Sequence, residues 1–250
     1  MADDLRVDRH LLLAGAPATA GGTGRRLFQL YAGLALYGAS MALLVRSALG
    51  VMPWDVLHQG LAGRLGWSIG AVTIAVGVLV LLAWVPLRQR PGLGTVSNVL
   101  VIGVAVDATL AVLPAPDAAV ARAGFLVAGV LLNAVATAAY IGVHLGPGPR
   151  DGLMTGLVRR SGWSVRRVRT SLEVGVVATG WLLGGTLGLG TVVYALCVGP
   201  LVQVLLPRLS LPLAGSGTAP QADGRDGSDG EHQQADRAAA GDGPGREDQQ

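Results

Sequence analysis

Six long apolar runs, each with at most one charged residue, most constrain how this chain can fold. They cover approximately residues 27–45, 69–87, 95–113, 124–143, 170–187 and 191–206. A bilayer-spanning helix needs about 20 apolar residues and tolerates somewhat fewer. A soluble helical bundle would instead need polar outer faces, which these runs lack. We therefore expect an all-α, polytopic membrane protein with six transmembrane helices.

Charged residues are distributed unevenly along the chain. Residues 27–208 hold only five acids, and we expect this stretch to be the membrane domain. Residues 1–26 and 209–250 contain little that could form a core, so we expect two disordered cytoplasmic tails. The net charge of +3 sums over these unlike regions and gives no support to nucleic-acid binding. The expected partner is the lipid bilayer.

Arginine placement predicts the orientation, because short cytoplasmic loops accumulate positive residues. With the N-terminus inside, eleven arginines in or beside the membrane domain fall on the cytoplasmic side. Only Arg46, Arg64 and Arg122 fall outside. We therefore expect both termini in the cytoplasm.

An internal repeat with an offset of 96 residues divides the membrane domain into residues 27–113 and 122–208. Residues 49–73 align without gaps on the second copy, with 12 identities in 25 positions that include Pro, Asp and Gly-Trp-Ser. Each copy holds three predicted spans, an odd number, so the second copy starts from the opposite side. We expect two inverted three-helix repeats, a recurrent plan in secondary transporters.

A short segment follows the first span of each repeat, at residues 53–64 and 149–160. Each starts with proline, which suits a first helical turn, and each is too short to span a bilayer. We expect short re-entrant or interfacial helices that enter from opposite faces. Asp55 and Asp151 fall in their first turns. These acids either complete a helix start, where the helix dipole favours negative charge, or build a cation or proton site.

Three further candidates for substrate or ion binding lie close to these acids. Arg150 either binds an anionic substrate, assisted by backbone N–H groups, or pairs with its neighbour or with lipid phosphate at the interface. His58 follows Asp55 by three residues, which puts both on one helix face and allows a proton relay. Its repeat counterpart is Met154, which breaks the pairing. The third candidate, Trp54, directly precedes Asp55.

The remaining polar candidates are Asp107 in the third span and Gln203, its counterpart in the sixth. Both are expected to face the bundle, although Asp107 alternatively reaches interfacial water. The single cysteine, Cys197, excludes an intramolecular disulfide framework and a multi-cysteine metal site. No nucleophile–base pair, metal cluster or cofactor motif is visible. We expect no metal, no cofactor and no enzymatic activity.

The motifs resemble the YczE-like (YczE/YyaS/YitT) family of bacterial integral membrane proteins. The likeness is carried by Leu-Gly-Val-Met-Pro-Trp-Asp-Val-Leu at 49–57, Gly-Trp-Ser-Ile-Gly at 66–70 and Leu-Gly-Pro-Gly-Pro-Arg-Asp-Gly-Leu-Met at 145–154. It covers roughly residues 27–207. It implies a multi-pass protein of the bacterial plasma membrane and carries over no catalytic residue.

The architecture favours a transporter or permease for an unidentified small solute or proton. The alternative is a non-transporting membrane scaffold or regulatory protein. Transport predicts a polar cavity between the repeats that contains Asp55 and Asp151, whereas a scaffold predicts a closed, dry core.

Overall fold

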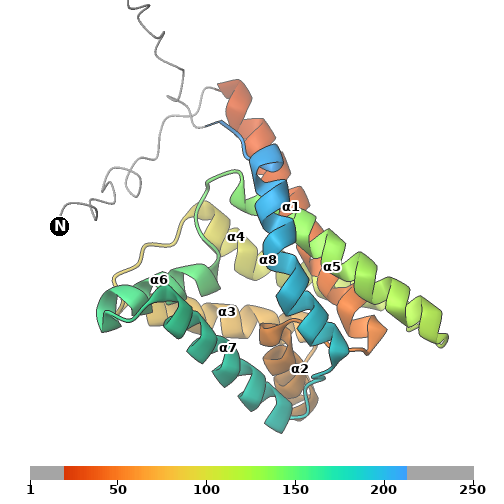
Figure 1. Ribbon diagram of the computed structural model, residues 1–250. Coiled ribbons are helices and arrows are strands. Elements are labelled where there is room, and N and C mark those ends of the chain that lie inside the picture. Colours follow the sequence, from red (N-terminus) through yellow and green to blue (C-terminus); the bar gives the residue numbers. More distant parts are fainter. Residues whose placement is uncertain (1–19, 213–250) are drawn as a thin grey trace, which may run out of the picture. The chain divides into compact units, whose positions relative to one another are not determined.

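The computed structural model describes residues 20–212, and this part of the chain contains helices and no strands. Eight helices follow one another: α1 (Ala20–Ser47), α2 (Pro53–Leu65), α3 (Ile69–Trp84), α4 (Leu93–Val112), α5 (Ala119–Ile141), α6 (Pro149–Ser161), α7 (Val165–Leu182) and α8 (Leu189–Leu209) (Figure 1). The all-α fold class is confirmed. Each of the six apolar runs lies mainly in one long helix, and two short helices, α2 and α6, begin at the predicted prolines.

Four of the described helices, α1, α4, α5 and α8, are long and apolar enough to cross a membrane. Helices α2 and α3 meet the same test together, as a pair bent by 114°. Helix α3 alone has only 16 residues and is too short to count as a span. Helix α7 is too polar, because three of its first five residues are Arg166, Arg167 and Arg169. The described chain therefore has four candidate spans, or five with the bent pair, where the sequence predicts six.

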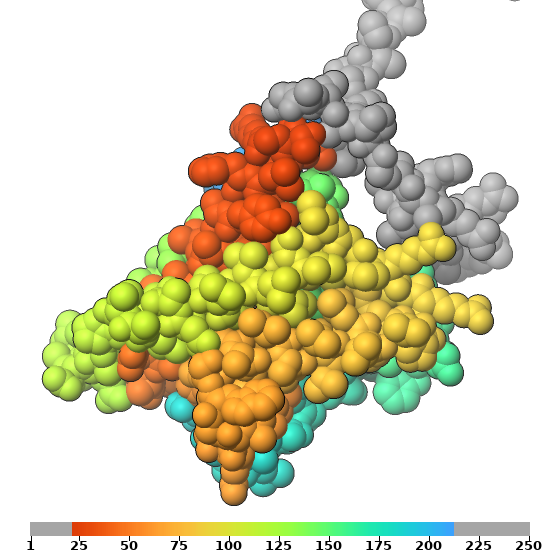
Figure 2. Space-filling model, turned by 180° about the vertical axis from the view of Figure 1, so that it is seen from behind, coloured from red at the N-terminus to blue at the C-terminus, as the bar shows by residue number. Residues whose placement is uncertain are grey.

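The outer surface of the long helices is apolar. Helices α3, α4 and α5 form much of the face seen in Figure 2. Leu79 on α3, Val104 on α4 and Val127 on α5 are all more than half exposed. Trp67 and Trp163, which precede α3 and α7, are each 55% exposed. Exposed apolar surface of this extent is typical of lipid contact, and indoles favour its edges.

Helix α1 is central, because it packs against both α4 and α5. Leu34, Met41 and Leu44 on α1 are fully buried. At Gly38 an added Cβ would lie 2.6 Å from the Ala105 Cβ of α4, so the two helices approach at small residues. Outside this core, α5 packs on α8, α2 on α7, and α3 on both α4 and α6.

Helices α2 and α6 have the same construction. Each starts with proline at its first position, and neither Met52 nor Gly148 at the N-cap supplies a side-chain cap. Each ends at a glycine in the left-handed region, with φ of 68° at Gly66 and 69° at Gly162. The following serine in each case, Ser68 or Ser164, caps the next helix.

The two repeats hold each other's helix starts. The loop after α1 supplies the Leu49 carbonyl, which accepts from Gly190 N–H at the start of α8, 2.7 Å away. In the same way, the Leu145 carbonyl after α5 accepts from Gly94 N–H at the start of α4, at 2.9 Å. The next residues, Gly50 and Gly146, have φ of 122° and 124°. We call these two contacts the reciprocal loop contacts.

The repeats differ where the short helices pack on α3 and α7. Trp84 of α3 is buried against Gly152 of α6, where an added Cβ would lie 2.0 Å from the indole. In the counterpart pair, Gly180 of α7 lies against the backbone of Val56 in α2. The Trp84 side chain makes the contact at Gly152, whereas the backbone of α2 makes the contact at Gly180. The two halves are therefore alike in backbone and unlike in packing.

The boundaries of the helical part differ from those expected at residues 27 and 208. Helix α1 already begins at Ala20. After α8, Leu211 is buried, and its N–H donates to the Gly142 carbonyl at 2.8 Å, while Arg26 donates to the Pro212 carbonyl. Backbone pairing and burial thus extend the folded part at both ends. The remainder of the two expected tails, residues 1–19 and 213–250, lies outside the described residues.

Candidate functional site

A cavity of about 420 Å³ lies among the helices, and each of the eight described helices contributes to its lining. Much of the lining consists of residues that correspond at the 96-residue offset. Examples are Pro53 with Pro149, Trp54 with Arg150, and His58 with Met154. The cavity is therefore built from equivalent positions of both repeats, and its volume suits a small molecule.

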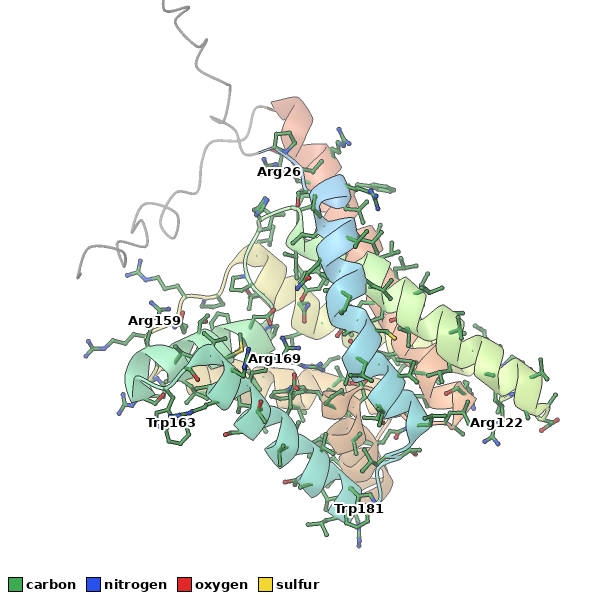
Figure 3. The ribbon with its side chains drawn as sticks, in the orientation of Figure 1. Arg26, Arg122, Arg159, Trp163, Arg169 and Trp181 are labelled. Carbon is green, nitrogen blue, oxygen red and sulfur yellow. The ribbon has the colours of Figure 1, made fainter. Side chains whose placement is uncertain are left out.

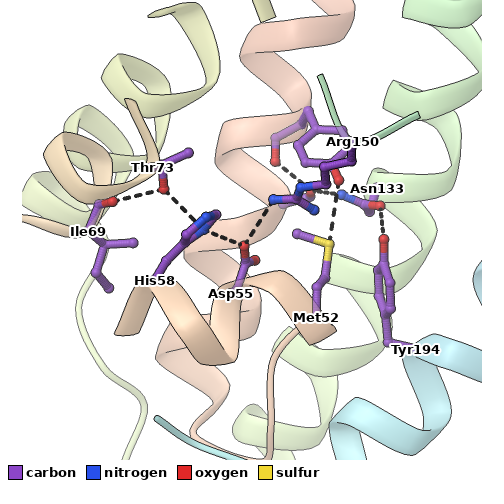
Figure 4. Close-up of polar contacts among 10 residues, drawn as sticks. Met52, Asp55, His58, Ile69, Thr73, Asn133, Arg150 and Tyr194 are labelled. Atoms are coloured by element: carbon purple, nitrogen blue, oxygen red, sulfur yellow. Dashed lines mark hydrogen bonds and ion pairs between the residues drawn. The ribbon is translucent and has the colours of Figure 1, made fainter. Parts of the chain in front are cut away.

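Helix α2 brings Asp55 and His58 together in the protein interior. Asp55 is completely buried, His58 is nearly so, and the His58 Nδ1 lies 3.1 Å from the Asp55 Oδ1 (Figure 4). The spacing of three residues places both on one helix face, as the sequence predicts. His58 is part of the cavity lining, whereas Asp55 itself is not.

Thr73 of α3 defines the proton position on His58. The Thr73 hydroxyl donates to the Ile69 carbonyl at 2.8 Å, and its Oγ1 lies 3.3 Å from the His58 Nδ1. Because the hydroxyl has a single proton, its oxygen accepts from the ring. The Asp55 carboxylate also accepts. Both neighbours therefore require a hydrogen on Nδ1, which leaves Nε2 as the basic nitrogen of a neutral His58.

Arg150, at the start of α6, reaches across to α2. Its Nη2 lies 3.7 Å from the Asp55 Oδ1, and its Cζ lies 5.0 Å from the centre of a Trp54 ring, a cation–π distance. Within residues 20–212 no hydrogen bond joins its guanidinium to another group. The buried Asp55 Oδ2 also has no hydrogen-bond partner among the described residues. The buried acid is thus paired at one oxygen only.

A second polar cluster joins α1, α5 and α8. The Asn133 amide is completely buried; it donates to the Ser40 hydroxyl at 2.8 Å and accepts from the Tyr194 hydroxyl at 2.7 Å. The Tyr37 hydroxyl contacts the Met52 sulfur at 3.7 Å. Tyr37 and Tyr194 both line the cavity, so this cluster orients part of its wall.

Charged side chains of α6 and α7 form another part of the lining. Arg169 and Glu173 pair with each other at 2.9 Å and are both exposed. Figure 3 shows Arg159 and Trp163 projecting outward from the region where α6 joins α7, whereas Arg169 lies on the side of α7 that faces α8. Asp151 also lines the cavity and is exposed. The two repeat-related acids therefore lie in different environments: Asp55 is completely buried, and Asp151 is exposed in the cavity lining.

Asp107 and Gln203, predicted to correspond, have different surroundings. Asp107 accepts from the Ser68 hydroxyl at 2.5 Å and from Gly70 N–H at 2.8 Å, so it holds the start of α3. It does not line the cavity, whereas Gln203 does. Asp107 therefore has a structural contact that neither of the two sequence hypotheses specified.

Sequence reasoning missed several residues of the site. Asn133 and Tyr37 correspond at the repeat offset, as do Tyr194 and Asn98, and all lie inside apolar runs. Polar residues at matched positions in two spans are the signal that identifies them. Thr73 gave no such signal, because its counterpart is Arg169. Among the described residues, no group of three His, Cys, Asp or Glu side chains could hold a metal ion.

Comparisons with known proteins agree on one family. A family model described as "Family of unknown function (DUF6198)" matches residues 24–207. An uncharacterized protein of Haemophilus influenzae is 43% identical over 69% of this chain and 79% of its own length. The uncharacterized membrane protein YczE of Bacillus subtilis is 31% identical over 71% of this chain and 84% of its own. The uncharacterized protein YyaS of the same organism is 23% identical over 70% of this chain and 89% of its own length. No solved structure matches.

Proposed function

We propose that this chain, which belongs to the YczE-like membrane protein family matched by the DUF6198 model, transports a small polar solute through the cavity at the repeat interface. The observation that carries this proposal is the completely buried Asp55, joined to His58 and Arg150 beside a cavity lined by all eight described helices. Ionisable groups inside a membrane protein are costly and are usually functional.

The proposed architecture has six spans, α1, α3, α4, α5, α7 and α8, arranged as two inverted repeats. Support comes from the matched turns at Gly50 and Gly146 and from the reciprocal loop contacts. In this arrangement α2 and α6 are half-helices that enter from opposite faces, with their N-terminal ends at the cavity. Discontinuous helices that meet near the midplane form the binding sites of many secondary transporters.

The proposed location is the bacterial plasma membrane with both termini in the cytoplasm. The support is the arginine count, which is nine against three between the two sides when Arg150 and Arg169 of the cavity lining are left out. Arg159, Arg166 and Arg167 then lie on the cytoplasmic side, together with the connection between α6 and α7.

The experiment that tests transport does not require the identity of the solute. Purified protein is reconstituted into proteoliposomes, which are incubated with the small-molecule fraction of a carbon-13-labelled bacterial extract. Mass spectrometry then identifies labelled species retained inside the vesicles. We expect at least one small solute to accumulate beyond its level in empty vesicles, with net accumulation lost in Asp55→Asn and reduced in Asp151→Asn. The matched control is Asp117→Asn, since Asp117 is an exposed acid in the α4–α5 connection, outside the cavity lining.

Two outcomes would contradict the proposal. One is a vesicle content that does not differ between native protein and empty liposomes. The other is accumulation that is equal in native protein, Asp55→Asn and Asp117→Asn, which would mean that the buried acid plays no part. The first outcome would favour a non-transporting scaffold.

A further inference from the structure

The Arg150 guanidinium has unused hydrogen-bond donors in a cavity that holds a small molecule. Its five N–H donors make no hydrogen bond within residues 20–212, and its ion pair with Asp55 is 3.7 Å long. A well-formed pair between arginine and a carboxylate is about 2.7–2.9 Å long and often bidentate. Arg150 is 30% exposed although it is part of the cavity lining. A planar acceptor entering the cavity could therefore bind it better than Asp55 does.

The buried Asp55 needs a positive partner whether or not Arg150 supplies it. A buried unpaired carboxylate is strongly unfavourable. His58 offers the second partner, because its Nδ1 already lies 3.1 Å from the Asp55 Oδ1. Protonation at Nε2 makes the ring an imidazolium, which keeps the Nδ1 hydrogen that Thr73 and Asp55 both accept. Asp55 thus has two alternative counter-charges, Arg150 and a protonated His58.

We propose that the cavity binds a small organic carboxylate together with one proton. The solute carboxylate replaces Asp55 as the partner of Arg150, and a proton from water at Nε2 of His58 neutralises Asp55 in its place. The Nε2–H bond of His58 is the only bond that forms, the O–H bond of a solvent hydronium ion is the only one that breaks, and the anion and the proton together add no net charge to the site. The inference deepens the proposed transport function and rests on it: the coupled ion is the proton, and the solute class is the organic monocarboxylates.

The walls of the cavity favour an organic anion over an inorganic one. Apart from the charged groups, the lining is rich in apolar side chains from α3, α4 and α8, including Val76, Val80, Val99, Ile102 and Val198. An apolar body attached to the carboxylate would bury against them. The N-terminal ends of α2 and α6, which carry Trp54 and Arg150, add partial positive charge on the side where the carboxylate would bind.

The charged and titratable groups on the neighbouring helices leave this balance in place. Helix α3 has no charged residue, and Arg64 on α2 itself is turned to the Leu183 carbonyl. On α7, Arg169 and Glu173 neutralise each other. The other titratable groups of the cavity lining are Arg150 and Asp151 on α6 and the hydroxyls of Tyr37 on α1, Tyr140 on α5 and Tyr194 on α8. The negative charge of Asp151 is offset by the neighbouring Arg150 and Arg169.

Binding to the full-length protein in detergent tests the inference without requiring flux. The probes are benzoate and hexanoate as carboxylates, benzamide as the neutral isostere of benzoate, and benzamidine as the cationic one. Equilibrium dialysis is done at about pH 5.5 and about pH 7.5. We expect at least one carboxylate to bind, with little binding of benzamide or benzamidine. The affinity for that carboxylate should fall by up to about tenfold per pH unit between these two values, with uptake of about one proton per anion, measured with an indicator dye in weak buffer.

Three variants test the roles of Arg150 and Asp55, with Arg90→Gln as the control. Arg150→Gln should weaken carboxylate binding about tenfold or more, whereas Arg90→Gln, outside the cavity lining, should leave it unchanged. Asp55→Asn leaves Arg150 without its competing carboxylate. It should therefore bind the same probe at both pH values without taking up a proton. A loss of structure would remove binding altogether, so retained binding without proton uptake distinguishes the proposed role from misfolding.

Several results would overturn the inference: no binding of either carboxylate, tighter binding of benzamidine, or carboxylate binding by the native protein without proton uptake. Proton uptake that persists in Asp55→Asn would overturn it as well. Its failure can be separated from failure of the transport proposal. Accumulation of a non-carboxylate solute in proteoliposomes would support transport and refute the inference. Proton-linked carboxylate binding with no flux of that probe and no accumulation of any labelled solute would support the proposed binding and refute transport.

Discussion

Substituting Gly152 with alanine should disturb the contact between α6 and α3, and the structure sets the size of the effect. The new Cβ would lie 2.0 Å from Cζ2 and 2.4 Å from Cη2 of Trp84. Carbon atoms in contact are about 3.5–4.0 Å apart, so the indole or α6 must move by about 1.5 Å. Trp84 is 1% exposed and its Nε1 donates to the Pro149 carbonyl at 3.0 Å. The ring therefore has little free space, and its movement stretches that hydrogen bond.

The expected cost follows from these contacts. Overpacking of this kind destabilises by about 1–3 kcal/mol. Loss of the Trp84 hydrogen bond adds about 0.5–1.5 kcal/mol. Replacing a helical glycine with alanine offsets about 0.5–1 kcal/mol. We therefore expect Gly152→Ala to lower the free energy of unfolding by about 0.5–4 kcal/mol.

The measurement is equilibrium unfolding of the purified protein in mixed micelles, with a rising fraction of a denaturing detergent and helix content followed by circular dichroism. Gly175→Ala is the matched control, because an added Cβ on that α7 glycine meets no atom within 4 Å. It should be neutral or slightly stabilising. Trp84→Phe removes the indole atoms nearest to Gly152. It should therefore be less costly in the Gly152→Ala background than in the native chain, by about 0.5–3 kcal/mol. Equal stability of Gly152→Ala and Gly175→Ala, or strictly additive effects with Trp84→Phe, would refute the packing argument.

Three further outcomes follow from other parts of the structure. Asn133→Leu removes the hydrogen bonds to the Ser40 and Tyr194 hydroxyls and should lower the free energy of unfolding by about 1–3 kcal/mol in the same unfolding assay; a neutral effect would contradict the assigned hydrogen bonds. Asp107→Asn should weaken the start of α3 by about 1–2 kcal/mol while carboxylate binding stays unchanged, so altered affinity without lost stability would contradict its structural role. In a cysteine-free background, Asp117→Cys should react with an impermeant maleimide on intact cells and Arg90→Cys should not; the reverse pattern would invert the proposed orientation.

The positions of the helices could be predicted because their signals are local. Apolar runs identify the long helices, Pro53 and Pro149 mark the starts of the short ones, and Gly66 and Gly162 end them. The three-residue spacing also predicts that Asp55 and His58 share a face. These features depend only on helix period and backbone preference, which neighbouring residues determine.

The asymmetry of the site could not be predicted in this way. Asp55 and Asp151 occupy equivalent positions, yet one is completely buried and the other is exposed. The difference arises from long-range packing: Arg150 reaches α2, and Gly152 packs on the Trp84 side chain whereas Gly180 packs on the backbone of α2. Helix α7 is a second difference between expectation and structure. Its three arginines near the start make it too polar to count as a candidate membrane span, although its second half is apolar.

The reciprocal loop contacts bear on how the protein is assembled during synthesis. The Gly94 N–H at the start of α4, in the first half, donates to the carbonyl of Leu145, which is translated about fifty residues later. Helix α1 likewise packs against α5, which has not yet emerged when the first half is complete. The first half therefore leaves the ribosome without its partners and holds polar backbone groups that it cannot satisfy alone. These contacts can therefore form only after the second half has been synthesised, and each half then completes a helix start of the other.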